Sequence, residues 1–166
     1  MHNYQECIGK EFEFGTEDCL TLIRRFYKIQ FNIDIPNYAR PKNFWQHDLD
    51  LYGRLTHKEG FTPLTVHPSE YQFGDLVLMA IQSSFASHAG VLVENGQLLH
   101  HLWGQTSCVT SYKGMFRNNT LAVMRHKDVK LSNSETPTDL MDVLSPGQQR
   151  RIRNELDRIS QIQVSE

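Results

Sequence analysis

Cys19 stands at a position where a thiol could act as a nucleophile. It opens a run, residues 19–30, whose apolar side chains recur at helical spacing, and Thr16 or Asp18 could cap the helix that this run predicts. In the first turn of a helix, unpaired backbone N–H groups favour a thiolate and can bind the oxyanion that its attack on a carbonyl creates. Because the Asp18 carboxylate opposes thiolate formation, we expect a cationic partner nearby.

His88 is the candidate base for this thiol. It stands in Ser87-His88-Ala89-Gly90, at the head of a predicted strand and beside small residues that leave room for another group. A base of this kind is commonly oriented by a third polar side chain, and His100 and His101 follow in the next predicted strand.

The turn Glu94-Asn95-Gly96 decides which of these two histidines shares a face with His88. A loop of two residues would pair Gly90 with His101. A loop of three residues, with Gly96 left-handed, would pair Gly90 with His100 instead and make His100 a diagonal neighbour of His88. The residues alone leave both registers open.

The elements that must position these groups follow a simple order. The sequence predicts helices at residues 19–30 and 44–55, followed by strands at 76–80, 89–93, 97–102 and 120–126. Helices followed by antiparallel strands predict an α+β fold with the helices on one face of the sheet. Three aromatic residues late in the chain are expected in the core: Trp103, Tyr112 and Phe116.

Composition favours one soluble globular domain with an appendage. The chain has 166 residues, of which 39% are apolar and 22% charged, and its formal net charge is −2. This balance argues against a nucleic-acid partner, and no apolar run reaches the length of a membrane span. Residues 1–10 lack the pattern of a secretion signal, so none is expected. Three widely spaced cysteines argue against a disulfide framework, and the expectation for Cys7 and Cys108 is simple burial.

The C-terminal part differs from the rest. After a domain at residues 1–127, residues 128–145 are polar and suit a linker. Ser145-Pro146-Gly147-Gln148 then predicts the start of a helix at 146–166. Its narrow apolar stripe consists of Ile152, Leu156 and Ile159. Such a stripe is typical of a helix that docks on another protein, and the alternative is that it packs on its own domain.

The ordered motifs resemble those of the NlpC-type family of cell-wall cysteine peptidases. They are Gly-x-x-Phe-x-Phe-Gly-x-x-Asp-Cys ending at Cys19, then Gly74-Asp75-Leu, then His88-Ala-Gly-Val, then His100. The resemblance covers about residues 5–126. The approach Gly-Thr-Glu-Asp-Cys, Ile35-Pro36-x-Tyr38 and Arg125-His126 also resemble the tail-assembly peptidases of long-tailed phages.

This resemblance implies a papain-like α+β fold and a cysteine endopeptidase that cuts amide bonds in peptidoglycan stem peptides. Its catalytic residues would be Cys19, His88 and His100, the last at the family's spacing of twelve positions after the first histidine. The candidate substrate-binding residues are Phe12, Asp18, Ser87 and His101. No metal or cofactor is implied. The expected location is the virion tail, with other tail-tip proteins as partners of the C-terminal helix.

Two departures from the family pattern keep an alternative open. Leu20-Thr21 replace the usual Ser-Gly after the cysteine, and Phe12 replaces a tyrosine. Together with the docking-like tail, they suit a structural tail-tip protein that keeps the fold with weak or no activity. A zinc site would need Cys19 and His88 with both His100 and His101, and adjacent strand residues point to opposite faces, which disfavours it.

Overall fold

The computed structural model describes residues 3–42, 50–129, 147, 150 and 151. The chain divides into two compact units, residues 1–130 and 131–166. In the second unit Gly147, Arg150 and Arg151 are helical. The apolar stripe expected for that helix and most of the expected linker lie outside the described residues.

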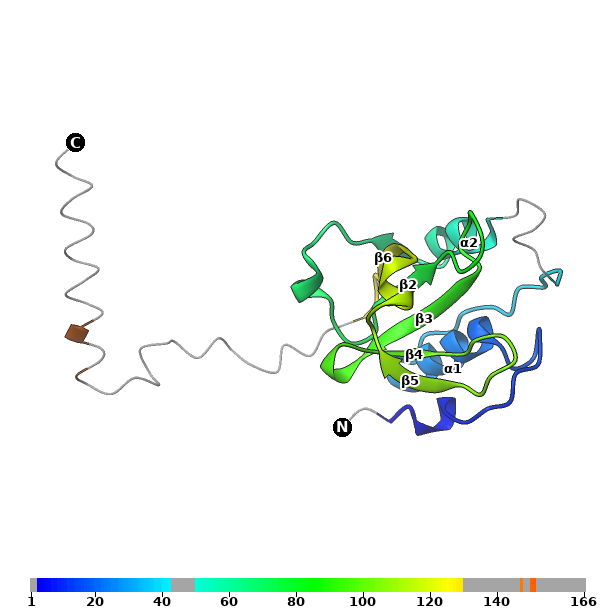
Figure 1. Cartoon of the computed structure of the whole chain (residues 1–166), viewed down its shortest axis with the longest axis horizontal. Coiled ribbons are helices and arrows are strands. Elements are labelled where there is room, and N and C mark those ends of the chain that lie inside the picture. Colours follow the sequence, from blue (N-terminus) through cyan, green and yellow to red (C-terminus); the bar gives the residue numbers. More distant parts are fainter. Residues whose placement is uncertain (1–2, 43–49, 130–146, 148–149, 152–166) are drawn as a thin grey trace. The chain divides into compact units, whose positions relative to one another are not determined.

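The described helices of the first unit are α1 (Cys19–Phe31), α2 (Leu51–Lys58) and α3 (Met115–Asn118) (Figure 1). Helix α1 begins where the sequence predicts, because the Asp18 side chain accepts a hydrogen bond from the backbone N–H of Thr21. It ends at Asn32, whose left-handed backbone (φ 54°) closes the last turn. No described helix is long and apolar enough to cross a membrane.

Helix α2 ends later than the sequence predicted. Its described part begins at Leu51, where the Asp50 carboxylate caps the backbone N–H of Gly53 at 2.9 Å. The helix then runs through Lys58, three residues beyond the predicted end at position 55. Residues 43–49, which include the whole first half of the predicted helix, lie outside the described part of the chain.

A six-stranded antiparallel sheet forms the centre of the unit, which confirms the α+β class. Its strands lie in the order β1-β6-β2-β3-β4-β5. Their bounds are β1 (Phe61–Pro63), β2 (Leu76–Met79), β3 (His88–Val93), β4 (Gln97–His100), β5 (Cys108–Ser111) and β6 (Thr120–His126). The two edge strands were not predicted, because their sequences, Phe-Thr-Pro and Cys-Val-Thr-Ser, contain no run of apolar residues. Short 3₁₀ turns lie at Gln5–Cys7, Pro68–Glu70 and Glu94–Gly96.

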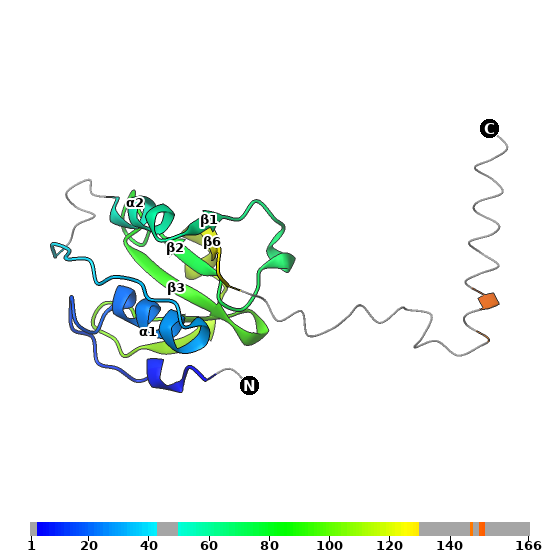
Figure 2. The ribbon, with the colours of Figure 1, turned by 180° about the vertical axis from the view of Figure 1, so that it is seen from behind.

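The two faces of the sheet are covered differently. Helix α1 packs against β3 on one face, as the view from behind shows (Figure 2). A core cluster formed by Val77, Met79, Leu92, Leu98 and Val123 lies on the other face, judged by the strand register. Tyr112 and Phe116 pack against this cluster as expected. The expectation was wrong for Trp103, which lies beyond the end of β4 and is 55% exposed.

The hairpin of β3 and β4 has the three-residue loop. Val93 pairs with Gln97 and Gly90 pairs with His100. Asn95 and Gly96 both adopt left-handed conformations, with φ of 58° and 64°. This register therefore sets His100, and not His101, on the face of His88.

The Gly74-Asp75 motif anchors the sheet to α1. The buried Asp75 carboxylate accepts two hydrogen bonds from Arg125 on β6, at 2.7 and 2.8 Å. The Tyr27 hydroxyl of α1 donates to the Gly74 carbonyl at 2.5 Å. Gly74 has a φ of +87°, and a Cβ there would come within 2.6 Å of the Phe31 ring, so both conformation and space require glycine.

Candidate active site

A cleft of about 390 Å³ brings together most of the side chains that the sequence selected. It is lined by Cys19 and His88, and by all four predicted substrate-binding residues: Phe12, Asp18, Ser87 and His101. His100 packs against His88, with the two imidazole rings perpendicular and their centroids 5.6 Å apart. The described residues thus gather in one place groups that lie up to 89 positions apart, from Phe12 to His101.

Cys19 is the first residue of α1, and its thiol is half-buried. Its sulfur lies 2.9 Å from the hydroxyl oxygen of Tyr52, and the backbone N–H of Ala89 also donates to it. Burial, followed by the nearby Asp18 charge, raises the pKa of the Cys19 thiol. The hydrogen bonds from Tyr52 and Ala89 act in the opposite direction and are outweighed. In the resting cleft at neutral pH, the thiol therefore keeps its proton.

Asp18 is paired with Arg40, a cation that the sequence analysis did not select. The Arg40 guanidinium donates to one carboxylate oxygen through Nε, at 3.0 Å, and through Nη2. Backbone N–H groups of Gly15 and Thr21 donate at 2.8 and 3.0 Å. Burial alone would raise the pKa of Asp18, but the hydrogen bonds from Arg40, Thr21 and Gly15 together lower it. The expected need for a cation near Asp18 is therefore met by Arg40 rather than by a histidine.

His88 and His100 are both neutral at pH 7. They are 5% and 1% exposed, and burial lowers the pKa of His88 to about 3 and that of His100 to about 4. Nε2 of His100 lies 3.1 Å from the Thr110 hydroxyl. Within the described part of the chain, His88 Nε2 and His100 Nδ1 are buried with no hydrogen-bond partner. A neutral imidazole can accept a proton, so His88 has the form that a general base requires.

His101 and Ser87 form parts of the cleft wall. Nε2 of His101 lies 3.0 Å from the Gln105 carbonyl oxygen. The His101 and Phe12 rings pack edge to face, with their centroids 5.2 Å apart. The Ser87 hydroxyl donates to the Ile81 carbonyl at 2.9 Å and accepts from the Ile81 N–H at 3.1 Å. The Ser87 contacts close the loop that leads into β3, so the hydroxyl already has a structural role.

An aromatic group borders the cleft. Trp103 lies 5.3 Å from Phe12 and 5.9 Å from Phe14 between ring centroids. The Arg40 guanidinium carbon lies 5.7 Å from the centre of the Phe14 ring. All four side chains line the cleft, and the exposed Trp103 ring gives this border an apolar surface in contact with solvent.

Tyr52 and Arg40 are the two side chains of this site that the sequence analysis missed. Tyr52 was assigned only to the apolar face of a helix, because nothing local distinguishes a hydroxyl that reaches a thiol from one that reaches solvent. The signal for Arg40 was indirect, since a buried carboxylate beside a nucleophile needs a cation. Neither contact can be inferred from spacing, because the partners lie 33 and 22 positions apart.

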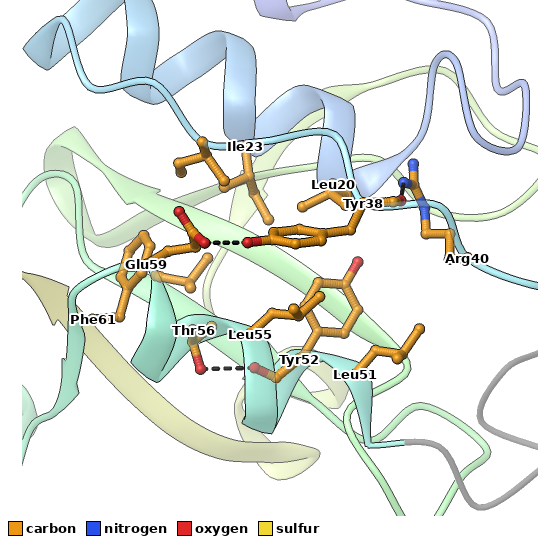
Figure 3. A pocket seen from close by; sticks show the side chains of 12 residues that line it. Leu20, Ile23, Tyr38, Arg40, Leu51, Tyr52, Leu55, Thr56, Glu59 and Phe61 are labelled. Carbon is orange, nitrogen blue, oxygen red and sulfur yellow. Dashed lines mark hydrogen bonds between the residues drawn. The ribbon is translucent and has the colours of Figure 1, made fainter.

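A second, smaller pocket of about 40 Å³ lies next to the cleft and shares Tyr52 and Arg40 with it (Figure 3). Its walls are mostly aliphatic and aromatic side chains from α1, α2 and the segment between them. Tyr38 extends across this pocket, and its hydroxyl donates to the Glu59 carboxylate. The Tyr52 ring therefore has an apolar pocket on one side and the candidate nucleophile at its hydroxyl end.

The zinc alternative is not supported by the arrangement of the histidines. Among the residues that the structure describes, no three His, Cys, Asp or Glu side chains are grouped so that they could hold a metal ion. His100 contacts Thr110, whereas His101 contacts Gln105.

Residues 9–125 match the NlpC/P60 family. Tail tip assembly protein K of Escherichia phage lambda is 33% identical over 119 residues, which cover 72% of this chain and 58% of that protein. The protein of the same name from Escherichia phage N15 is 31% identical over 125 residues, which cover 74% of this chain and 50% of that protein. The chain thus spans about half the length of these relatives.

Solved structures include an NLP/P60-family protein of Staphylococcus aureus described as similar to lipoprotein. It aligns with a TM-score of 0.49 and 16% identity, over 74% of this chain and 38% of that chain. The family match covers well over half of the present sequence and includes Cys19, His88 and His100. The chain belongs to the NlpC/P60 family.

Proposed function

We propose that this chain is a cysteine peptidase that hydrolyses amide bonds in peptidoglycan stem peptides, with Cys19 as nucleophile, His88 as base and His100 as the residue that orients it. The observation that carries this proposal is the shared cleft, in which the Cys19 thiol at the start of α1 and the buried neutral His88 face the same space. The backbone N–H groups of the first turn of α1 are suited to bind an oxyanion there.

The protonation states of Cys19 and His88 favour general-base catalysis, in which a neutral imidazole takes the proton of a neutral thiol. Because burial raises the pKa of Cys19 and lowers that of His88, both groups are uncharged before substrate binds. In the proposed reaction His88 takes the thiol proton while the sulfur attacks the amide carbonyl carbon, forming a C–S bond and an oxyanion. Collapse of the oxyanion breaks the C–N bond, and the leaving amine takes the proton from His88.

The second half of the reaction regenerates the enzyme. His88 removes a proton from a water molecule, whose oxygen attacks the thioester carbon. The C–S bond breaks as the new carboxylic acid leaves, and His88 returns the proton to the Cys19 sulfur. His100 can orient His88 in both halves, because its ring packs directly against that of His88.

The biological setting that we propose is a phage tail tip. Two relatives at 31% and 33% identity are named tail tip assembly proteins. The family match, at residues 9–125, includes every residue that lines the cleft. A peptidase carried at a tail tip could open peptidoglycan locally. We further propose that residues 1–127 are the peptidase domain, and that a linker at 128–145 joins it to a helix at 146–166 that binds other tail-tip proteins.

The test is cleavage of purified peptidoglycan and of a defined stem peptide, followed by mass spectrometry. Cys19→Ala should abolish cleavage and leave the thermal unfolding midpoint nearly unchanged, because removing the nucleophile costs chemistry rather than packing. Cys7→Ala is the control, since Cys7 is also a free cysteine and does not line the cleft, whereas the Cys108 sulfur lies 3.8 Å from His100 Nε2. Cleavage that persists in Cys19→Ala would assign the activity to another group.

The alternative is a structural tail-tip protein that keeps the fold with weak or no activity. Leu20-Thr21 in place of Ser-Gly, and the raised pKa of Cys19, favour this alternative. The same experiment separates the two functions. A wild-type chain that folds, enters tails and cleaves no stem peptide would support the structural function and reject the peptidase.

A further inference from the structure

Tyr52 is the second residue of helix α2, and its neighbours hold it in place. Asp50 caps α2, and the Thr56 hydroxyl donates to the Tyr52 carbonyl at 2.7 Å. The Tyr52 residue is 7% exposed, and its ring extends from α2 toward Tyr38 and Leu20 (Figure 3). This packing fixes where the hydroxyl points, so its position is a property of the fold rather than of a free surface side chain.

The hydroxyl oxygen of Tyr52 lies 2.9 Å from the Cys19 sulfur. Burial, followed by the nearby Cys19, raises the pKa of Tyr52 well above its usual value, so the phenol keeps its proton at neutral pH. A thiolate can only accept hydrogen bonds. Once Cys19 loses its proton, Tyr52 must therefore be the donor in this contact.

Tyr52 is also the hydroxyl best placed to serve the reacting carbonyl. Among the described residues that line the cleft, hydroxyl groups come from Tyr52 and Ser87. The Ser87 hydroxyl donates to the Ile81 carbonyl and so is already engaged. The oxygen of a tetrahedral intermediate is separated from the Cys19 sulfur by one carbon atom, so a donor in contact with the sulfur needs only a small shift to reach it.

We propose that Tyr52 is a further catalytic residue, whose hydroxyl donates to the Cys19 thiolate and then to the oxyanion of the tetrahedral intermediate. This inference rests on the proposed peptidase function. Helix α2, which contains neither the cysteine motif nor a histidine motif, would thus supply a residue that contacts the reacting atoms. The donor also counteracts in part the effects of burial and Asp18, which disfavour the thiolate.

Tyr52→Phe tests the inference, because it removes the hydroxyl and keeps the ring. We expect kcat for a stem peptide to fall by about a hundredfold, the loss typical of one oxyanion donor, with KM nearly unchanged. Alkylation of Cys19 by iodoacetamide, followed site by site by mass spectrometry, should be about tenfold slower at pH 7, because the thiolate loses a charged hydrogen bond. The pH profile of alkylation should shift to higher pH.

Tyr38→Phe is the matched control. It removes another tyrosine hydroxyl beside the same small pocket, one that bonds to Glu59 rather than to the thiol. Its kcat and its Cys19 alkylation profile should match those of the wild type. If Tyr52→Phe does not fold, 3-fluorotyrosine at position 52 keeps the shape and is a stronger donor, so the alkylation profile should shift to lower pH.

The outcomes separate the inference from the function on which it rests. An unchanged alkylation profile in Tyr52→Phe, or in the fluorinated variant, would overturn the role of Tyr52 even if the wild type is an active peptidase. An unchanged kcat in Tyr52→Phe would overturn it as well. A wild-type chain without turnover would instead reject the peptidase function, and this result is read from the wild type alone.

Discussion

The imidazole rings of His88 and His100 lie perpendicular to each other in the interior, with centroids 5.6 Å apart. Their contact follows from the pairing of Gly90 with His100 across β3 and β4. The nitrogens His88 Nε2 and His100 Nδ1 have no hydrogen-bond partner within the described chain, whereas His100 Nε2 contacts Thr110. If Thr110 accepts the Nε2 proton, Nδ1 of His100 remains an acceptor for a proton on His88.

His100→Ala should therefore lower kcat for a stem peptide by about a hundredfold or more, because the base loses the group that sets its orientation and tautomer. His101→Ala should mainly raise KM, since His101 lines the cleft and contacts Phe12 and the Gln105 carbonyl. Steady-state rates of the two variants decide between these roles. A near-normal His100→Ala together with a large kcat loss in His101→Ala would reverse the assignment.

Stability should fall as the pH is lowered below about 6.5. Unfolded histidines protonate near that pH, whereas His88 and His100 stay neutral in the folded protein down to about pH 4. The unfolded chain then binds more protons than the folded one, so the free energy of unfolding decreases with falling pH. The expected loss is about 1.4 kcal/mol per pH unit for each of the two histidines.

Urea denaturation at pH 7, 6 and 5 measures this slope. His88→Gln should reduce it by about 1.4 kcal/mol per pH unit, because the proton that His88 binds in the unfolded chain no longer contributes. His67→Gln, at an exposed position, is the control for the same change of residue type. An equal slope in the wild type and in His88→Gln would show that His88 titrates alike in the folded and unfolded chains.

Arg40→Met should destabilise the fold by about 3–5 kcal/mol, because it leaves the buried Asp18 carboxylate without its cation. Both side chains of this pair are at most 5% exposed. The control is Arg25→Met, which breaks the pair of Arg25 with Glu17, whose side chains are 26% and 31% exposed. That loss should be about 1 kcal/mol or less. Free energies from urea unfolding that are equal for the two variants would contradict the special role of the buried pair.

Deleting residues 131–166 should leave the first unit folded, because its core, including the buried Val129, is retained. The thermal midpoint and stem-peptide cleavage should stay near those of the full chain. Incorporation into tails, measured by immunoblot of purified particles, should fall. Asp substitutions at Ile152, Leu156 and Ile159 should reproduce this fall, whereas a shortened chain that unfolds would place the C-terminal helix in the core.

Local signals in the sequence determined much of the architecture. A capping residue before an apolar helical pattern located the start of α1 at Cys19, and short apolar runs located the strands β2, β3, β4 and β6. The edge strands β1 and β5 were not predicted because neither contains a run of apolar residues. Trp103 was misplaced because an aromatic residue next to a strand usually joins the core, whereas this one lies beyond the strand end and borders the cleft.

The sequence by itself determined the order of the chemical groups, which is a cysteine at the start of a helix followed by histidines in a hairpin. This order also identified the family. Only the tertiary structure decided the register that selects His100, the pairing of Asp18 with Arg40, and the contact of Tyr52 with Cys19. The reason is physical. Capping and periodicity act between neighbours along the chain. Two side chains that are far apart in the sequence, such as Tyr52 and Cys19, come into contact only when the helices pack on the sheet.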